Sequence, residues 1–397
     1  MKSAWVLSGA MFSSYLGISI LAPVLPPLMR ELGLSELQGG LILTGSSIMW
    51  VIFSPWWGRR SDVSGRKPVI LLGLGGYALG VLGFALVTQA GLDGVIASAT
   101  VTWLLLVGAR LIVGMLFSAA GPAAQAYIAD VSAGRQRVSA MGILSASNGL
   151  ATILGPALAA LVVGLGLAAP ILLSAITPLF GMLLVWRLLP AVPAKLKRGQ
   201  RAPALRITDP RLLPLLLIGF FVMSGLSVTQ FTIGFLFQDR LGLDGVETAR
   251  LVGLAVMASG VALLFAQMVL IQVFRLTPLT LLRLGIPLML IALIVLTPAA
   301  DFAAMTLALV LMGLAVGMVM PGFRTAITFA VEPHEQGAAA GLANSVPGYS
   351  FIFGPPLGTA LYGVNAGSPY LLAALFVVAA FAILALHTRE RAVQPAT

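Results

Sequence analysis

Charged side chains are scarce in this sequence, and their scarcity excludes a soluble fold. Only 9% of the 397 residues are charged, whereas about a quarter of an average soluble domain is. Hydrophobic residues make up 59%, and the mean hydropathy is +1.03. A soluble protein needs charge to cover its surface, so most of this chain's surface must face lipid.

Cysteine is absent and histidine nearly so, which removes several kinds of chemistry. Without cysteine there is no disulfide framework, cysteine-bound metal or thiol nucleophile. The two histidines, His334 and His387, fall near expected helix ends. The sequence also lacks a Ser/His/Asp set and a phosphate-binding Gly-x4-Gly-Lys loop. We therefore expect neither an enzyme nor a primary pump, and no metal and no cofactor.

Apolar runs long enough to span a bilayer recur along the whole chain. A spanning helix needs about 20 apolar residues, and the first run is interpreted as an uncleaved helix rather than a signal peptide. The sequence therefore predicts an all-α membrane protein with twelve transmembrane helices, at Ala4–Leu28, Leu37–Trp57, Pro68–Ala90, Trp103–Ala129, Ser139–Gly166, Ala169–Leu188, Leu212–Phe237, Thr248–Val273, Leu279–Ala299, Ala303–Phe329, Gly337–Val364 and Pro369–His387.

The net charge of +10 marks the orientation of these helices rather than a nucleic-acid partner. With the N-terminus inside, only Arg30, Arg240 and Arg250 lie in outer segments. Cytoplasmic segments of membrane proteins are enriched in Lys and Arg. The chain is thus expected in the cell (inner) membrane with both termini in the cytoplasm. The expected inner basic residues are Lys2, Arg59, Arg60, Arg66, Lys67, Arg135, Arg137, Arg187, Lys195, Lys197, Arg198, Arg201, Arg206, Arg211, Arg275, Arg283, Arg389 and Arg391.

A basic, proline-containing stretch at 189–211 divides the chain into two similar halves. Residues 1–188 and 212–387 each hold six runs, and 388–397 form a cytoplasmic tail. Four matching pairs are each 199 residues apart, which predicts a parallel repeat of six helices related by a pseudo-two-fold axis along the membrane normal. The pairs are Gly142/Gly341, Gly149/Gly348, Gly155/Gly354 and Pro156/Pro355.

The segment between the second and third runs combines glycines with charges. Gly58 and Gly65 permit tight turns. Asp62 can accept hydrogen bonds from a helix N-terminus, and Arg66 can pair with Asp130 at the inner end of Trp103–Ala129. We interpret these residues as a latch on the inner side; the alternative is a plain positive-inside anchor. The predicted latch residues are Gly58, Asp62, Gly65, Arg66, Lys67 and Asp130.

These motifs resemble those of the major facilitator superfamily. The segment from Gly58 to Lys67 is similar to the signature between the second and third helices, with Val63 where a basic residue is usual. The pattern Leu16-Gly17-x5-Pro23-Val24-Leu25-Pro26 is similar to that of the twelve-helix drug:proton antiporter branch. Gly142, Gly155 and Pro156 resemble the antiporter motif of the fifth helix, with Ala151, Ala159 and Ala160 replacing other glycines. The resemblance implies proton-coupled efflux.

Arg110 is a charge inside a predicted span, about 10 Å from the start of Trp103–Ala129. It is part of Arg110-x2-Val113-Gly114, which resembles the family's Arg-x2-Gln-Gly element and implies a role in coupling protons to substrate. A charge at this depth is costly unless it faces protein or water; the alternative is a structural arginine bound to backbone carbonyls. The predicted lining of a central polar cavity is Arg110, Tyr15, Ser19, Gln125, Ser227, Gln230 and Arg324.

None of the thirteen acidic residues falls in the middle of a span that could line this cavity. Proton coupling would then use Asp130 or Asp239 near the surfaces. A cavity without a buried carboxylate suits neutral or anionic amphipathic molecules.

We hypothesise a monomeric secondary transporter that works by alternating access and exports a small molecule in exchange for protons. The alternatives are an importer or uniporter of a small solute, a lipid flippase, and a non-transporting membrane scaffold or sensor. The expected partners are the small-molecule substrate, protons and the lipid bilayer, with no nucleic acid.

Overall fold

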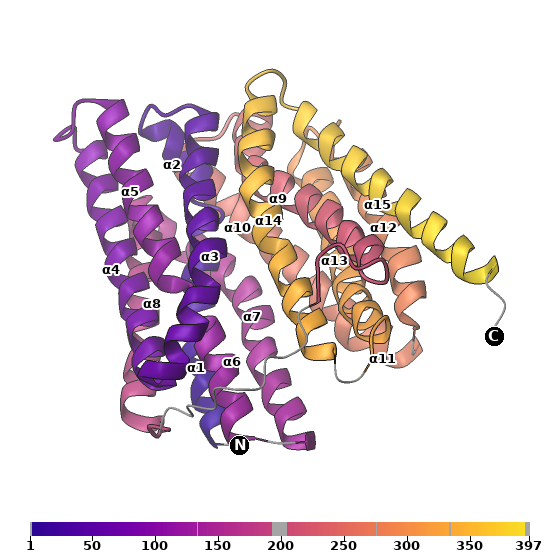
Figure 1. The fold of residues 1–397 in the computed structure, drawn as a ribbon. Coiled ribbons are helices and arrows are strands. Elements are labelled where there is room, and N and C mark those ends of the chain that lie inside the picture. Colours follow the sequence, from indigo (N-terminus) through magenta and orange to yellow (C-terminus); the bar gives the residue numbers. More distant parts are fainter. Residues whose placement is uncertain (1, 133, 193–204, 275, 333–334, 394–397) are drawn as a thin grey trace. The chain divides into compact units, whose positions relative to one another are not determined.

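The computed structural model describes all residues except 1, 133, 193–204, 275, 333–334 and 394–397. The described part contains helices and no strand (Figure 1). In chain order the elements are α1 (Lys2–Leu21), α2 (Leu25–Glu31), α3 (Glu36–Ser64), α4 (Arg66–Leu92), α5 (Ala99–Phe117), α6 (Ala120–Val131), α7 (Gly134–Val162), the 3-10 turn η1 (Val163–Leu165), α8 (Ala168–Leu188), α9 (Leu213–Leu241), α10 (Gly245–Phe265), the π-helical turn η2 (Ala266–Leu270), α11 (Ile271–Phe274), α12 (Pro278–Leu296), α13 (Phe302–Phe329), α14 (Gln336–Tyr362) and α15 (Ser368–Val393).

The twelve predicted runs each correspond to a long helical segment of the described chain. Eleven of these segments are long and apolar enough to span a bilayer, and α5 with α6 counts as one of them, Ala99–Val131. The twelfth is α14, which has 27 residues but is less apolar, because it contains Pro347, Pro355, Pro356 and several glycines. The predicted all-α membrane fold of twelve helices is confirmed.

Two predicted helices are broken in the structure, and proline explains both breaks. The run Ala4–Leu28 is interrupted after Leu21, at Pro23, and a short helix, α2, follows. The run Trp103–Ala129 is interrupted at Ser118 and Ala119, where Pro122 has no N–H to donate to the carbonyl of Ser118. In each case the backbone turns tightly instead, as in the hydrogen bond from Ala119 N to Leu116 O, 3.1 Å.

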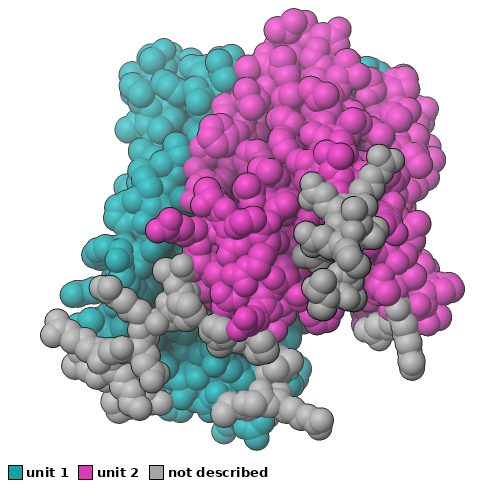
Figure 2. Space-filling view, turned by 45° about the vertical axis from the view of Figure 1, so that its right-hand side comes forward, with its two compact units in different colours: residues 1–198, 237–257 teal, residues 199–236, 258–397 magenta. Residues whose placement is uncertain are grey.

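The chain forms two compact units, coloured separately in Figure 2. Unit 1 comprises Met1–Arg198 with Phe237–Met257, and unit 2 comprises Gly199–Leu236 with Ala258–Thr397. The segment Phe237–Met257 of unit 1 belongs to the predicted C-terminal half, 212–387. The two units therefore do not coincide with the two predicted halves, and the division at 189–211 stays a prediction.

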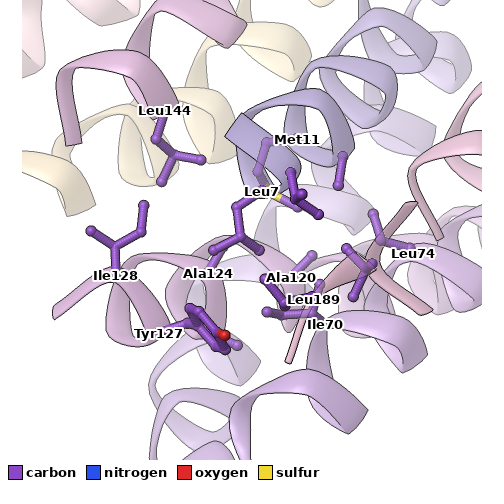
Figure 3. Packing of buried hydrophobic residues seen from close by; sticks show 14 of the residues in the cluster. Leu7, Met11, Ile70, Leu74, Ala120, Ala124, Tyr127, Ile128, Leu144 and Leu189 are labelled. Atoms are coloured by element: carbon purple, nitrogen blue, oxygen red, sulfur yellow. The ribbon is translucent and has the colours of Figure 1, made fainter. Parts of the chain in front are cut away.

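Unit 1 is held together by α1, which packs against α7 and α8, and by α4, which packs against α5 and α8. One of its apolar clusters joins α1, α4, α6 and α7 through side chains that include Leu7, Ile70, Tyr127 and Leu144 (Figure 3). In unit 2, α12 corresponds to α4 of unit 1, and it packs against α13 and α15. The pairs α4–α5 and α4–α8 thus recur as α12–α13 and α12–α15, as a parallel repeat predicts.

Small residues allow the helices of each unit to approach closely at matching positions. A methyl group on Gly155 of α7 would overlap Ser19 of α1, and one on Gly354 of α14 would overlap Ser227 of α9. In a bilayer, van der Waals packing at small residues is a main source of helix association. The glycine repeat seen in the sequence therefore marks two equivalent helix crossings.

We expect Gly155→Ala to destabilise the protein, because the added methyl group has no space beside Ser19. Overpacking of this kind costs about 1–3 kcal/mol. Thermal unfolding of the purified protein in detergent measures the effect.

Gly142→Ala is the matched control, because Gly142 lies on the same helix and has open space around it. Alanine favours a helix interior by about 1 kcal/mol over glycine, so this variant should unfold at an unchanged or higher temperature. Equal unfolding temperatures for the two variants would contradict the packing described.

Candidate functional site

The predicted latch segment is mostly helical in the structure. Residues Gly58 to Ser64 form the last two turns of α3, and only Gly65, with a φ of +88°, separates them from α4. The predicted spans left a connection of ten residues here, from Gly58 to Lys67. That expectation was wrong, because α3 continues through Pro55 without a break and ends only at Ser64. The positive φ explains why glycine occupies this joint.

Arg66 is the centre of the predicted latch segment, and all three nitrogens of its guanidinium are bonded. Its Nε donates to Asp130 Oδ2 at 3.0 Å, as the sequence predicted. One terminal nitrogen lies 2.5 Å from Asp62 Oδ1, and the other donates to Ser61 Oγ at 2.6 Å. Asp62 is therefore a partner of Arg66, where the sequence had suggested a helix N-terminus. We call Ser61, Asp62, Arg66 and Asp130 the latch cluster; it joins α3, α4 and α6.

Lys67, the neighbour of Arg66, binds the end of α8. Its Nζ donates to Trp186 O at 2.8 Å and to Leu189 O at 2.7 Å, which satisfies carbonyls that the helix end leaves open. Tyr127, one turn before Asp130, donates its hydroxyl to Pro190 O at 3.0 Å. The first residues of the predicted linker are thus held by residues adjacent to the latch cluster.

Arg110 lies further from its helix start than predicted. It is 11 residues after Ala99, which corresponds to about 16 Å, because α5 begins four residues before the predicted run. Its guanidinium carbon is 5.7 Å from the centre of the Phe84 ring, a cation–π distance. Within the described chain its Nε is buried and has no hydrogen-bond partner.

Tyr77 of α4 lies near Arg110 and is connected to α8 and α1 by hydrogen bonds. Tyr77 interacts electrostatically with Arg110. The Tyr77 hydroxyl lies 3.1 Å from Ser174 Oγ, and Ser174 donates to Gly17 O at 2.7 Å. Burial of an arginine without a carboxylate is expensive, about 2.5–3.5 kcal/mol on insertion scales. Among the described residues Arg110 forms no ion pair, and it lies near the Phe84 ring and Tyr77.

Sequence reasoning missed the aromatic cluster beside Arg110. Phe117 contacts Tyr15, Trp50 and Tyr77, with ring centres 6.3, 5.6 and 5.1 Å apart. The four rings come from α1, α3, α4 and α5. Residues so far apart in the sequence carry no local signal that they meet. Tyr15 is thus in the same unit as Arg110. It contacts Phe117, which contacts Tyr77, and Tyr77 interacts electrostatically with Arg110.

The other predicted lining residues are divided between the units. Ser19 and Gln125 belong to unit 1, as do Tyr15 and Arg110, whereas Ser227, Gln230 and Arg324 belong to unit 2. Gln125, Gln230 and Arg324 are exposed. Ser227 is buried and donates to Ser350 O at 3.2 Å, a hydrogen bond between α9 and α14. That all seven line one cavity stays a prediction.

The three residues of the antiporter-type motif have different surroundings. Gly155 is a close-contact position against Ser19, and Gly142 faces open space. The carbonyl oxygen of Pro156 lies close to Gly253 of α10, so that a methyl group added to Gly253 would be only 2.7 Å from it. Two of the three residues therefore serve close helix packing within unit 1.

A second ion-pair cluster, which the sequence did not reveal, surrounds Arg30 at the end of α2. Arg30 donates to Glu36 at 2.9 Å, to Asp239 Oδ2 at 3.0 Å and to Gln238 at 3.3 Å. Burial lowers the pKa of Arg30, but the hydrogen bonds that Arg30 donates to Asp239 and Glu36 outweigh this and hold its pKa above the usual value. Asp239, one of the two acids considered for proton coupling, is thus paired with an arginine, as Asp130 is.

The helices, the paired surface charges and the arginine within a span are features of a polytopic membrane carrier. The family comparison identifies which kind: a model described as "Major Facilitator Superfamily" matches residues 7–348. The chain belongs to this superfamily, and the resemblance inferred from the motifs is confirmed.

The relatives that match nearly the whole chain include two resistance proteins. "Multidrug resistance protein 2" of Bacillus subtilis (strain 168) is 28% identical over 387 residues, covering 94% of this chain and 92% of the relative. "Tetracycline resistance protein, class G" of Vibrio anguillarum is 30% identical over 371 residues, covering 89% and 88%.

Solved structures share the fold. The human organic anion transporter MFSD10 superimposes with a TM-score of 0.68 at 19% identity, covering 96% of this chain and 99% of that one. A bacterial homolog of the human lysosomal transporter Spinster, inward-facing and occupied, gives a TM-score of 0.73 at 14% identity, covering 97% and 96%. The predicted major facilitator fold is confirmed.

We expect Arg66→Gln and Asp130→Asn to be coupled in stability. Each variant breaks the same partly buried ion pair, so the double variant should lose less free energy of unfolding than the sum of the single losses, by about 1 kcal/mol. Unfolding titrations of the four proteins in mixed micelles measure this coupling energy.

The control cycle replaces Arg66→Gln by Arg59→Gln, because Arg59 is exposed and has no ion-pair partner among the described residues. Its coupling to Asp130→Asn should be near zero. Strictly additive effects in the Arg66 cycle would show that the pair contributes nothing measurable.

Proposed function

We propose that this protein is a secondary transporter that exports small neutral or anionic amphipathic compounds, drugs or metabolites, in exchange for protons. Membership of the superfamily supports transport, and the two resistance-type relatives support export. The observation that carries the substrate class is Arg110: a cation inside a span, with a buried nitrogen that has no partner in the described chain.

Arg110 would attract the acidic or electron-rich end of a substrate. Arg110 has no counter-ion in the described part of the chain, and such a buried charge gives a positive potential in a medium of low dielectric constant, where electrostatic attraction is strong. The neighbouring rings of Phe84 and the Phe117 cluster would contact the apolar part. We assign binding to Arg110, with Tyr15, Ser19, Gln125, Ser227, Gln230 and Arg324 as further candidate lining residues.

Proton coupling would act through carboxylates that are paired with arginines. Protonation of Asp130 would neutralise its charge and weaken its bond to Arg66, and protonation of Asp239 would do the same for Arg30. The two pairs lie on segments expected on opposite sides of the membrane. A proton taken up on one side and released on the other could thus bias alternating access.

We further propose that the protein functions as a monomer in the cell membrane with both termini in the cytoplasm. The excess of arginine and lysine in the expected inner segments supports this orientation.

The function is tested by flux in proteoliposomes with an imposed pH gradient. A fluorescent amphipathic carboxylate is the probe, and an amphipathic cation of similar size is its comparison. We expect the gradient to accelerate movement of the carboxylate but not of the cation. Arg110→Leu should reduce this flux about tenfold or more, which corresponds to one lost charge interaction, whereas Arg110→Lys should retain part of it.

Arg187→Leu is the control, because Arg187 is an exposed arginine at the end of α8. It should leave the flux unchanged. A carboxylate flux that is the same with and without the pH gradient would exclude proton antiport and favour uniport. Wild-type carboxylate flux in Arg110→Leu would remove the basis of the proposed binding site.

A further inference from the structure

A groove runs between α7 and the first part of α10, and the proposed transport mechanism does not use it. All of its lining belongs to unit 1, and its volume is about 550 Å³, within the range of sites that hold small molecules. The α7 side with η1 contributes Ala157, Ala160, Leu161 and Gly164, and the α10 side contributes Val246, Glu247, Arg250, Leu254 and Met257.

Helix periodicity explains why these residues form a continuous groove. On α7 the lining residues recur every three or four positions, and most of those on α10 do the same, so each set occupies one helix face. The helices touch at Gly253, where a methyl group would lie 2.7 Å from Pro156 O and 3.1 Å from Ala160 Cβ. Small residues on α7 leave the space beside this crossing.

The groove is polar at one end and apolar along the rest. Glu247 and Arg250 lie in the first two turns of α10, whereas Leu254 and Met257 follow at greater distance from the helix start. From Arg250 to Met257 the helix rises about 10 Å. One leaflet of hydrocarbon is about 15 Å thick. The change from charged to apolar lining therefore matches the change from headgroup to acyl chain in a lipid leaflet.

The two charges of the groove differ from the other described charge clusters. Arg30, Arg66 and Arg211 each have carboxylate partners within 3.0 Å. Glu247 and Arg250 are exposed and, among the described residues, form no ion pair with each other or with another side chain. They present one negative and one positive group at the charged end of an apolar groove.

We propose that this groove is a binding site for a phospholipid whose headgroup carries both a phosphate and an ammonium with N–H groups, as in phosphatidylethanolamine. The guanidinium of Arg250 binds the phosphate, because arginine can donate two parallel hydrogen bonds to phosphate oxygens. The carboxylate of Glu247 accepts from the ammonium. One acyl chain lies along Ala157, Ala160, Leu161 and Leu254.

Native mass spectrometry of the full-length protein, titrated with lipids of identical acyl chains, tests the proposal. The probes are phosphatidylethanolamine, phosphatidylcholine and phosphatidylglycerol. We expect the first to bind about fivefold more tightly than the other two, because only it combines a phosphate with an ammonium that can donate hydrogen bonds to Glu247. Glu247→Gln should abolish this preference, and Arg250→Gln should weaken binding of all three lipids.

Gly164→Leu provides an independent variant, because Gly164 lines the groove and a methyl group added there would meet no atom within 4 Å, so a larger side chain would extend into the groove. It should reduce binding of every lipid. Arg187→Gln, an exposed arginine outside the groove, is the control and should change nothing.

Unfolding temperatures of the variants establish that each remains folded. Equal binding of the three lipids to the wild type, or a preference that survives Glu247→Gln, would overturn the proposed headgroup. Unchanged lipid binding in both Arg250→Gln and Gly164→Leu would overturn the site itself.

Discussion

Close contact between helix backbones is the constraint on which the rest of this structure depends. Lipid tails are as apolar as leucine, so burying apolar side chains does little to hold helices together in a bilayer. The chain uses positions without bulky side chains instead: Gly155 meets Ser19 within unit 1, and Gly354 meets Ser227 within unit 2. The same device brings Gly114 against the backbone of Ser46. Because these crossings fix the helices at backbone distance, they also fix where the few charged side chains can lie.

Two arginines of unit 1 then differ in whether the nitrogens of their side chains have partners. Arg66 has a partner for every nitrogen, and its pairing with Asp130 joins helices that are distant in the sequence. Arg110 faces the ring of Phe84, and its Nε has no partner in the described chain. An unpaired buried donor is destabilising by about 1–3 kcal/mol. A site that retains such a group within the membrane is one in which a bound molecule can supply the missing interaction.

The sequence was sufficient to predict the class of fold because hydropathy and helix length are local properties. It also predicted the pair between Arg66 and Asp130, since few carboxylates lie at the inner ends of the predicted helices where Arg66 could reach them. It did not predict the helix breaks at Pro23 and Ser118, because a proline within an apolar run can either bend or end a helix. Clusters built from several helices, such as the rings around Phe117, depend on tertiary packing. No spacing in the sequence encodes those contacts.

The absence of an acidic residue from the middle of any span that could line a cavity places a physical limit on the coupling mechanism. A carboxylate that shares a site with substrate can exchange its proton for the substrate directly. Here the acids considered for coupling, Asp130 and Asp239, are each paired with an arginine near a helix end. A proton bound to either would act on an ion pair and hence on which helices stay joined, not on the charge beside Arg110. Coupling would then operate through the conformation of the carrier, with Arg110 holding a constant positive charge for the substrate throughout the cycle.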